Sequence, residues 1–470
     1  MPIKESTLSE LALLCNCNFY GEDLRLPLKV AIDSRDIKQG DVFFALPGEK
    51  TDGHLYIGDA IAKGAAAVVA ESSKYRESGL TLPDRNSGFS LLLTERNVNE
   101  LLTRLATVYL SIVNPDHVLA ITGSVGKTTT REFLKQLLTC HFRVHGADKS
   151  YNTDVGCAVT VLQMPVDTEV LVLEMGTNKP GDIASLVKSF PPTIALITAI
   201  AAAHLEKLRD RAGVIKAKME IAESKDLRSI IYNADDSDLE KTALELPVEI
   251  SKRGVGYTST HYRIKDVVSK IADKGCQVSF KLKTPVGEIS LDTNMFGKHQ
   301  VYCLALAIAC VIETGVFFEE INFSDHVFAS HKGRGKCYMM PERFLLIDDS
   351  YNANPSSMMA AIETVDNYNW GNEKIAVLGE MGELGENEVK HHKEVLKKAL
   401  ELDFLILVGQ KWYPAVSSLS ESAKSRIIFA DKKDLLNTIR SRISSGNIIL
   451  IKGSHSNRLD EIVAELVKSK

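Results

Sequence analysis

The sequence predicts an α/β protein made of three domains. Its length of 470 residues corresponds to about three domains at roughly 150 residues each. Its composition, 44% hydrophobic and 25% charged, is typical of a globular chain and excludes disorder as the dominant state. Over most of the chain, short apolar runs alternate with helix-like segments, a pattern that favours largely parallel sheets flanked by helices. We expect the domains to span residues 1–100, 101–327 and 328–470.

The first domain is predicted to be a small mixed α/β unit. Short apolar runs lie at residues 42–46, 65–70 and 89–93, and clusters of Gly, Pro and Asp separate them. Such clusters favour turns between short strands. We place its boundary with the second domain between Glu95 and Val113.

The central domain is predicted to contain a largely parallel sheet. Strand-like runs lie at 117–122, 170–174, 193–198 and 229–233, and a helix is expected from about Lys127. Residues 262–291 hold two strand-like runs around a turn-like segment at 284–287, which predicts an antiparallel excursion at the domain edge. A helix from Lys298 to about Thr314 follows, and the domain boundary is expected near 324–332.

The third domain repeats the alternation of strands and helices. Its buried strands are predicted at 344–348, 374–379, 404–409 and 448–453. This order favours a Rossmann-like α/β domain.

Charge and cysteine content exclude several classes of protein. A net charge of -5 gives no basic excess for binding nucleic acid or an anionic membrane. The eight cysteines include no C-x-x-C pair, so they predict neither a disulfide framework nor a zinc site, and a reducing compartment fits best. The N-terminal segment lacks an apolar signal region, and Glu313 interrupts the longest apolar run, so we expect a cytoplasmic protein without membrane insertion.

A Gly-rich loop is the strongest functional signal. Residues 120–130, Ala-Ile-Thr-Gly-Ser-Val-Gly-Lys-Thr-Thr-Thr, follow an apolar strand and precede a helix. In that setting backbone N–H groups and the helix N-terminus bind phosphates, with Lys127 reaching the β- and γ-phosphates and the Thr128 hydroxyl ligating magnesium. Ile121 stands where the strict pattern has Gly, so the loop is a G-x-x-G-K-T variant. The alternative is a Gly-rich turn with a capping Thr.

Three further polar residues follow strands or lie on a helix of the same domain. Glu174 ends one strand, His204 follows another, and Lys218 lies on a predicted helix. Taken singly, each of these residues is more typical of a structural or surface position than of a metal site. His391 and His392, on a helix expected to be exposed, are given no functional role. A guanine-specifying Asn-Lys-x-Asp motif is absent from the sequence.

Together with the loop, these residues resemble the Mur ligase family, ATP-dependent amide-forming enzymes that build the peptide of bacterial peptidoglycan. The resemblance runs essentially from end to end. Its motifs are Asp-Ser-Arg at 33–35, Gly-Asp-Val-Phe-Phe-Ala-Leu-Pro-Gly at 40–48, Asp-Gly-His at 52–54, the loop at 123–130, Glu-Met-Gly-Thr-Asn at 174–178, His-Leu-Glu at 204–206, Lys-Ala-Lys at 216–218, Gly-Lys-His at 297–299, Asp-Asp-Ser-Tyr-Asn-Ala-Asn-Pro at 348–355 and Gly-Glu-Met-Gly-Glu-Leu-Gly at 379–385.

Two of these motifs, at 348–355 and 379–385, are similar to the family member that adds D-alanyl-D-alanine to UDP-N-acetylmuramoyl-tripeptide. The diaminopimelate-adding member carries Asp-Asn-Pro-Arg, which this sequence lacks. The resemblance implies that the tripeptide carboxylate attacks ATP to form an acyl phosphate, which the amine of the dipeptide then converts to an amide. We also expect a monomer, although the sequence itself does not disclose the oligomeric state.

The resemblance assigns catalytic roles to Lys127, Lys218 and His204, and two magnesium sites. Thr128 and Glu174 are expected to hold one Mg²⁺, and Glu174, His204 and a carbamylated Lys218 the other. Carbamylation requires a neutral amine and hence a depressed lysine pKa. Motif alignment favours Lys218 over Lys216.

The remaining expected contacts are with nucleotides. The UDP end of the substrate is expected to contact Ser34 and Arg35. ATP is expected to contact Gly123, Ser124, Val125, Gly126, Lys127, Thr128, Thr129, Gln300, Arg334, Asp349 and Asn352. The family usually has the motif Gly-x-His-Asn-x-x-Asn, and in this chain Gln300 and Cys303 stand in place of its two asparagines. The family's Lys-Gly-Ser-Arg motif ends in His455 here. Cys303 cannot replace an amide, so the adenine contact is an open question.

Three alternatives remain. Another Mur ligase would add a different amino acid. A folylpolyglutamate synthase shares the loop and the last two domains but lacks the N-terminal domain that carries residues 33–35. A non-enzymatic P-loop switch would need a guanine motif and would have little use for Lys218 as a metal ligand.

Overall fold

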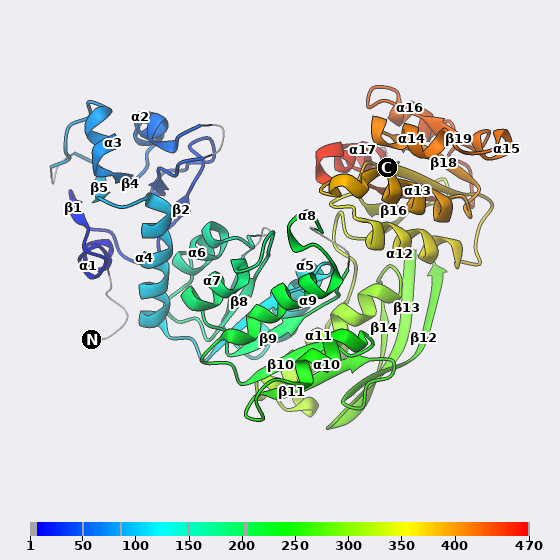
Figure 1. Ribbon diagram of the computed structural model, residues 1–470, viewed down its shortest axis with the longest axis horizontal. Coiled ribbons are helices and arrows are strands. Elements are labelled where there is room, and N and C mark those ends of the chain that lie inside the picture. The colour runs from blue at the N-terminus through cyan, green and yellow to red at the C-terminus, as the bar shows by residue number, and fades with distance from the viewer. Residues whose placement is uncertain are drawn as a thin grey trace.

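The computed structural model describes residues 7–48, 51–84, 87–147, 151–201, 205–273 and 275–468. Within them lie three sheets, of five, nine and six strands, that follow one another along the chain (Figure 1). In this view the N-terminal sheet lies at the left, the central sheet in the middle and the C-terminal sheet at the upper right. The predicted three-domain α/β fold is confirmed, whereas its residue boundaries remain a prediction.

The N-terminal sheet has the order β1-β5-β4-β3-β2 and is parallel except for the β1–β5 pair. Asp52 caps a short 3-10 helix by accepting a hydrogen bond from the His54 amide at 3.0 Å, so Asp-Gly-His forms a turn here. The elements are α1 (Leu8–Leu14), β1 (Asn18–Tyr20), β2 (Val30–Ala31), β3 (Val42–Phe44), η2 (Gly53–Tyr56), α2 (Ile57–Ala62), β4 (Ala67–Glu71), α3 (Ser72–Glu77) and β5 (Ser90–Thr94).

Helix α4 (Val98–Val113) joins the first sheet to the second. Asn97 caps its N-terminus, and Asn114 ends it in a left-handed conformation with a φ of 48°. Its apolar residues recur at helical spacing, and the helix packs on α6 of the central domain. The buried positions are Val98, Leu101, Leu102, Leu105, Ala106, Tyr109, Leu110 and Val113.

The central sheet has the order β14-β13-β12-β11-β10-β9-β6-β8-β7. Strands β7 to β12 pair in parallel, and β12, β13 and β14 form the predicted antiparallel extension. The apolar helix α11 packs against α5 and is largely buried.

The elements of the central domain are β6 (His117–Thr122), α5 (Lys127–Leu138), β7 (Val144–Gly146), α6 (Asp154–Leu162), β8 (Val170–Glu174), α7 (Asp182–Ser189), β9 (Ile194–Ile197), α8 (Leu205–Leu208), α9 (Arg211–Met219), η3 (Glu220–Glu223), β10 (Ser229–Asn233), α10 (Ser237–Leu244), β11 (Ser251–Gly256), β12 (Tyr262–Ala272), β13 (Gly275–Thr284), β14 (Gly287–Thr293), α11 (Lys298–Glu313), η4 (Phe318–Glu320) and η5 (Phe323–Asp325).

The C-terminal sheet has the order β15-β16-β20-β17-β18-β19, with only β15 antiparallel to its neighbour among these strands. Its elements are β15 (Lys336–Met339), β16 (Leu345–Asp349), α12 (Pro355–Asp366), β17 (Lys374–Gly379), η6 (Gly385–Asn387), α13 (Glu388–Ala399), β18 (Phe404–Val408), η7 (Gln410–Trp412), α14 (Tyr413–Val416), α15 (Glu421–Lys424), β19 (Ile427–Phe429), α16 (Leu435–Arg440), β20 (Ile448–Lys452), η8 (His455–Asn457) and α17 (Leu459–Lys468).

Two features bear on the predictions from composition. Among the described residues, no single helix has the length and apolar character needed to cross a membrane; one bent pair, Lys298–Glu313 with Phe318–Asp325, passes that test together.

All eight cysteines lie in the described part of the chain, and Cys276 and Cys337 form a disulfide while the other six are free. The sequence did not predict this bond, because its partners are 61 residues apart and lie in different sheets.

Candidate functional site

The Gly-rich loop connects β6 to α5 at the carboxyl edge of the central sheet. Gly123 and Gly126 adopt φ values of +142° and +93°, which favour glycine. A Cβ atom on Gly123 would lie 2.0 Å from the Thr198 hydroxyl, so this position also has no room for a side chain. The Thr198 hydroxyl in turn donates a hydrogen bond to the Val125 carbonyl at 2.6 Å. The two glycines and the Thr198 hydroxyl therefore hold the loop in one backbone conformation.

Lys127 begins α5 and extends back along the loop. Its Nζ donates a hydrogen bond to the Gly123 carbonyl at 2.7 Å. Desolvation lowers the pKa of this ammonium, the Glu174 carboxylate opposes the shift and Arg334 adds to it. Ser124 is held by a backbone hydrogen bond from its amide to the Ala199 carbonyl at 2.7 Å. The negative charge of bound phosphates would stabilise the ammonium form of Lys127, which burial disfavours.

Glu174 ends β8, the strand that pairs in parallel with β6, so its carboxylate lies beside the loop. The Thr128 hydroxyl donates to Glu174 Oε2 at 3.3 Å, and Arg131 Nη1 lies 2.9 Å from Glu174 Oε1. Glu174 and Arg131 are each only 2% exposed. The contact of Arg131 with Oε1 is an ion pair without hydrogen-bond geometry.

These donors fit magnesium. A hydroxyl and a carboxylate are hard oxygen ligands, and Mg²⁺ commonly keeps waters and substrate phosphates as its remaining ligands. Among the residues that the structure describes, no group of three or more His, Cys, Asp or Glu side chains could hold a metal ion. His204 lies outside the described residues.

Lys218 lies on α9 and is 2% exposed, whereas Lys216 on the same helix is exposed. Burial, followed by the nearby Lys127 ammonium, lowers the pKa of Lys218 to about 7. A large fraction of this amine is therefore neutral at neutral pH. Of the two lysines in the motif, only Lys218 has the environment that carbamylation requires.

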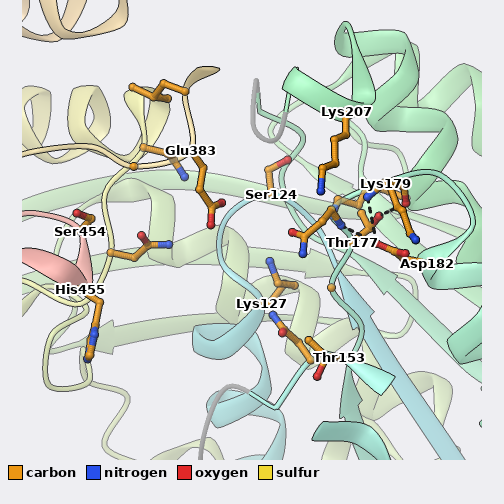
Figure 2. A pocket seen from close by; sticks show the side chains of 18 of the residues that line it. Ser124, Lys127, Thr153, Thr177, Lys179, Asp182, Lys207, Glu383, Ser454 and His455 are labelled. Carbon is orange, nitrogen blue, oxygen red and sulfur yellow. Dashed lines mark hydrogen bonds between the residues drawn. The ribbon is translucent and has the colours of Figure 1, made fainter. Parts of the chain in front are cut away.

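A cavity of about 820 Å³ opens between the central and C-terminal domains and contains the loop (Figure 2). Figure 2 shows Ser124 and Lys127 near the centre of the view, with Glu383, Ser454 and His455 to the left and Lys179, Asp182 and Lys207 to the right. Lys218 and Asn352 also line the cavity. Sequence reasoning assigned no role to Lys179, Asp182, Lys207 and Glu383. The first two could have been found, because Lys179 lies in the loop that follows Glu174 and Asp182 begins the next helix, α7.

Arg334 connects the C-terminal domain to the phosphate loop, although its side chain is not part of the cavity lining. Its Nη2 donates a hydrogen bond to the Thr128 hydroxyl at 3.2 Å, and its guanidinium lies 4.2 Å from the centre of the Tyr351 ring. The other two nucleotide contacts expected from the C-terminal domain, Asp349 and Asn352, are held by one lysine. Lys452 donates to Asp349 at 2.7 Å and to the Asn352 carbonyl at 2.9 Å.

Gln300 was expected at the nucleotide but, like Arg334 and Asp349, it does not line the cavity. Its amide nitrogen donates to the Arg334 carbonyl at 2.7 Å, and its oxygen accepts from the Ser330 hydroxyl at 2.8 Å. The side chain is 2% exposed and supports the backbone that carries Arg334. Cys303 lies near the loop, with its sulfur 3.8 Å from the Gly126 carbonyl.

Ser34 and Arg35 lie in the N-terminal domain, and neither lines the cavity around the loop. Arg35 is exposed and pairs with Asp33 at 2.6 Å, which lowers the pKa of that carboxyl to about 2. The Ser34 carbonyl accepts a hydrogen bond from Lys63 at 2.7 Å. An arginine exposed in this way is available to an anionic ligand.

Comparison with known proteins adds a family to this geometry. Three family models match consecutive parts of the chain: "Mur ligase family, catalytic domain" at 29–121, "Mur ligase middle domain" at 121–311 and "Mur ligase, glutamate ligase domain" at 333–455. A relative from Bacillus subtilis is 31% identical, with 94% of this chain and 93% of the relative covered. The chain belongs to the Mur ligase family.

Other relatives agree over nearly the full length of this Mur ligase. One from Escherichia coli is 31% identical, with 98% of both chains covered. Both curated relatives are named UDP-N-acetylmuramoyl-tripeptide–D-alanyl-D-alanine ligase. A crystal structure of the MurF ligase from Thermotoga maritima, in complex with ADP, superposes with a TM-score of 0.77 at 26% identity and covers 94% of this chain and 99% of that one.

Proposed function

We propose that this chain adds D-alanyl-D-alanine to UDP-N-acetylmuramoyl-tripeptide with conversion of ATP to ADP and phosphate, a step of peptidoglycan precursor synthesis. The observation that carries this proposal is the match, over 94% and 98% of the chain, to relatives named for that reaction. The ADP-bound relative and the phosphate-loop geometry support the use of ATP.

The chemistry follows from the cavity. The tripeptide carboxylate attacks the γ-phosphorus of ATP, forming an acyl phosphate and releasing ADP. The amine of the dipeptide then attacks the acyl carbon, and inorganic phosphate leaves. Negative charge accumulates on phosphoryl oxygens in the first step, so fixed positive charge is the main catalytic requirement. The loop amides of residues 123–129 and the Lys127 ammonium would supply it from the central domain. Arg334, which donates a hydrogen bond to the Thr128 hydroxyl, would supply it from the C-terminal domain.

Magnesium would be held first by Thr128 and Glu174, whose oxygens lie 3.3 Å apart. When bound, the metal neutralises phosphate oxygens and orients them for in-line transfer. We propose a second magnesium at Glu174, His204 and a carbamylated Lys218. The burial of Lys218 and its pKa of about 7 support carbamylation, because the neutral amine captures carbon dioxide and the product is an anionic oxygen ligand.

The remaining contacts with the substrates are proposed to come from the N-terminal and C-terminal domains. Ser34 and Arg35 are proposed to hold the UDP end of the substrate. Arg334, Asp349 and Asn352 would contact ATP from the C-terminal domain, which would also bind the dipeptide. For Gln300 we propose support of the Arg334 backbone, which its two hydrogen bonds favour over adenine recognition. We further propose a cytoplasmic monomer that binds neither nucleic acid nor membranes, since ATP and nucleotide sugars are cytoplasmic substrates.

The test is phosphate release across a panel of UDP-muramoyl peptides and amines. The proposal predicts release that requires both a UDP-muramoyl tripeptide and D-alanyl-D-alanine. Phosphate release with a single amino acid in place of the dipeptide would favour another Mur ligase. Phosphate release with a folate would favour a folylpolyglutamate synthase. Nucleotide hydrolysis without any acceptor would favour a P-loop switch. The panel also decides whether the third residue of the tripeptide is diaminopimelate or lysine.

A further inference from the structure

The disulfide between Cys276 and Cys337 joins two domains. Cys276 lies in β13 of the central sheet, and Cys337 lies in β15 of the C-terminal sheet. Their Cα atoms are 5.9 Å apart, which is within the range for disulfides. Figure 1 shows β12 and β13 reaching upward from the central domain to the C-terminal domain. The bond therefore adds a second covalent connection between domains that are otherwise joined by the chain.

The surroundings of the bond form a packed interface. Cys276 is 2% exposed and belongs to a hydrophobic core made mainly by the C-terminal domain, together with Phe296, Leu345 and Ile347. Gly275 adopts a φ of +120°, and a Cβ atom there would lie 3.1 Å from the Cys337 Cβ. This glycine lets β13 approach β15 closely. The two sulfurs are thus brought together by the packing of the two domains.

The bond lies beside the segment where the chain crosses between domains. Gly333 and Gly335 have φ values of +72° and +79°, and Cys337 follows two residues later. Arg334, between the two glycines, contacts Thr128 of the phosphate loop. Both glycine amides donate to Asp348, Gly333 to the carboxylate at 2.8 Å and Gly335 to the carbonyl at 2.7 Å. Asp348 lies in β16, so these hydrogen bonds hold residues 333–335 to the C-terminal domain. Movement of this domain relative to β13 would therefore move Cys337 relative to Cys276.

We propose that Cys276 and Cys337 are a reversible thiol-oxidation site, and that their disulfide fastens the C-terminal domain to β13 and restricts its movement relative to the central domain. The reduced form would leave the domain free to reorient. The oxidised form would hold the arrangement described above, with Arg334 against Thr128.

A peroxide is a sufficient oxidant. The thiolate of Cys337, the more exposed partner, attacks one oxygen of hydrogen peroxide and forms a sulfenic acid, and the hydroxide released takes up a proton to become water. The sulfur of Cys276 then attacks the sulfenic sulfur and releases a second water. In total, two thiols lose two electrons and two protons, and one peroxide gives two waters. A dithiol such as dithiothreitol reverses the reaction by exchange.

The test compares reduced and peroxide-treated full-length protein. Thiol titration after denaturation should fall from eight to six, and peptide mapping should identify the Cys276–Cys337 bond. Small-angle scattering with and without a non-hydrolysable ATP analogue should show a change in the reduced protein and a much smaller change in the oxidised one. Dithiothreitol should restore the full change. Ligation, which rests on the proposed function, should fall severalfold on oxidation and recover on reduction.

Variants separate this site from the other cysteines. Cys337→Ser should abolish the response to peroxide, although Cys303 beside the phosphate loop is still present. Cys140→Ser, which removes an exposed free cysteine, should leave the response unchanged. Retention of all eight thiols, or an oxidised form whose scattering change equals that of the reduced form, would overturn the proposal. A redox-dependent scattering change without ligation in either form would support it and contradict the proposed function instead.

Discussion

Replacing Arg334 by Ala removes the side chain that connects the C-terminal domain to the phosphate loop. Two contacts are lost, the hydrogen bond to the Thr128 hydroxyl at 3.2 Å and the cation–π contact with Tyr351 at 4.2 Å. A hydrogen bond from a charged group contributes about 1.5–3 kcal/mol. A cation–π contact contributes about 0.5–1 kcal/mol where solvent reaches it. Because Arg334 is half-buried, we take the lower part of this range, about 2–3 kcal/mol in total.

Because these contacts hold the Arg334 guanidinium at the phosphate loop, we take their loss as lost stabilisation of the transition state. The expected decrease in kcat/KM for ATP is then about 30- to 150-fold, at 1.36 kcal/mol for each factor of ten. The assay is phosphate release with the tripeptide and dipeptide substrates at saturation. Arg334→Lys keeps the charge but loses the planar stacking, so it should fall between wild type and Arg334→Ala.

The matched control is Arg442→Ala. Arg442 makes a similar contact, with its guanidinium 3.8 Å from the centre of the Phe404 ring, but this contact lies at β18 of the C-terminal sheet and not at the phosphate loop. It should lower thermal stability and leave kcat/KM nearly unchanged. The reasoning is refuted by an Arg334→Ala enzyme within twofold of wild type, or by an equal loss in the Arg442 variant.

Three further predictions concern the cavity. Lys127→Ala should reduce turnover by a factor of about 10²–10³, the cost of one lost charge-stabilising donor; near-normal phosphate release would remove the loop from the mechanism. Lys218→Ala should nearly abolish ligation and be partly rescued by short carboxylic acids, whereas Lys216→Ala, on the exposed side of α9, should retain activity. Because the pKa of Lys218 is lowered to about 7, the neutral amine predominates above that pH and the ammonium below it, so activation by bicarbonate should increase as pH rises through 7; a response only near pH 10 would contradict the carbamate.

The buried parallel strands of the central and C-terminal sheets could be predicted from the sequence to within a residue or two. Runs at 170–174 and 374–379 coincide with β8 and β17, because buried parallel strands are continuous apolar runs that end at polar or glycine residues. The position of Glu174 beside the loop also followed, since the carboxyl ends of neighbouring parallel strands lie at one edge.

Contacts between distant segments could not be predicted. Arg334 and Thr128 are separated by 206 residues, and nothing in either local pattern indicates that they meet. The role of Gln300 in supporting the Arg334 backbone depends on the same packing of domains. The disulfide was missed for this reason too.

One error was avoidable. His392 was expected on an exposed helix, but it is fully buried, with Nδ1 2.8 Å from the Glu388 carbonyl and its ring edge-on to Trp412. Helical spacing places it on the same face as the apolar residues that follow it, and this pattern could have been recognised in the sequence. Those residues are Val395, Leu396 and Ala399.

The central claim is that a carboxylate is activated by phosphorylation in the cavity between the central and C-terminal domains. The most direct measurement uses UDP-N-acetylmuramoyl-tripeptide whose reacting carboxylate carries ¹⁸O in both oxygens, with ATP, Mg²⁺ and D-alanyl-D-alanine. An acyl phosphate passes its bridging oxygen to phosphorus when the amine attacks the carbonyl. Mass spectrometry should therefore find one ¹⁸O in each inorganic phosphate released and one in the new amide. Unlabelled phosphate, formed by attack of water on ATP, would contradict the account.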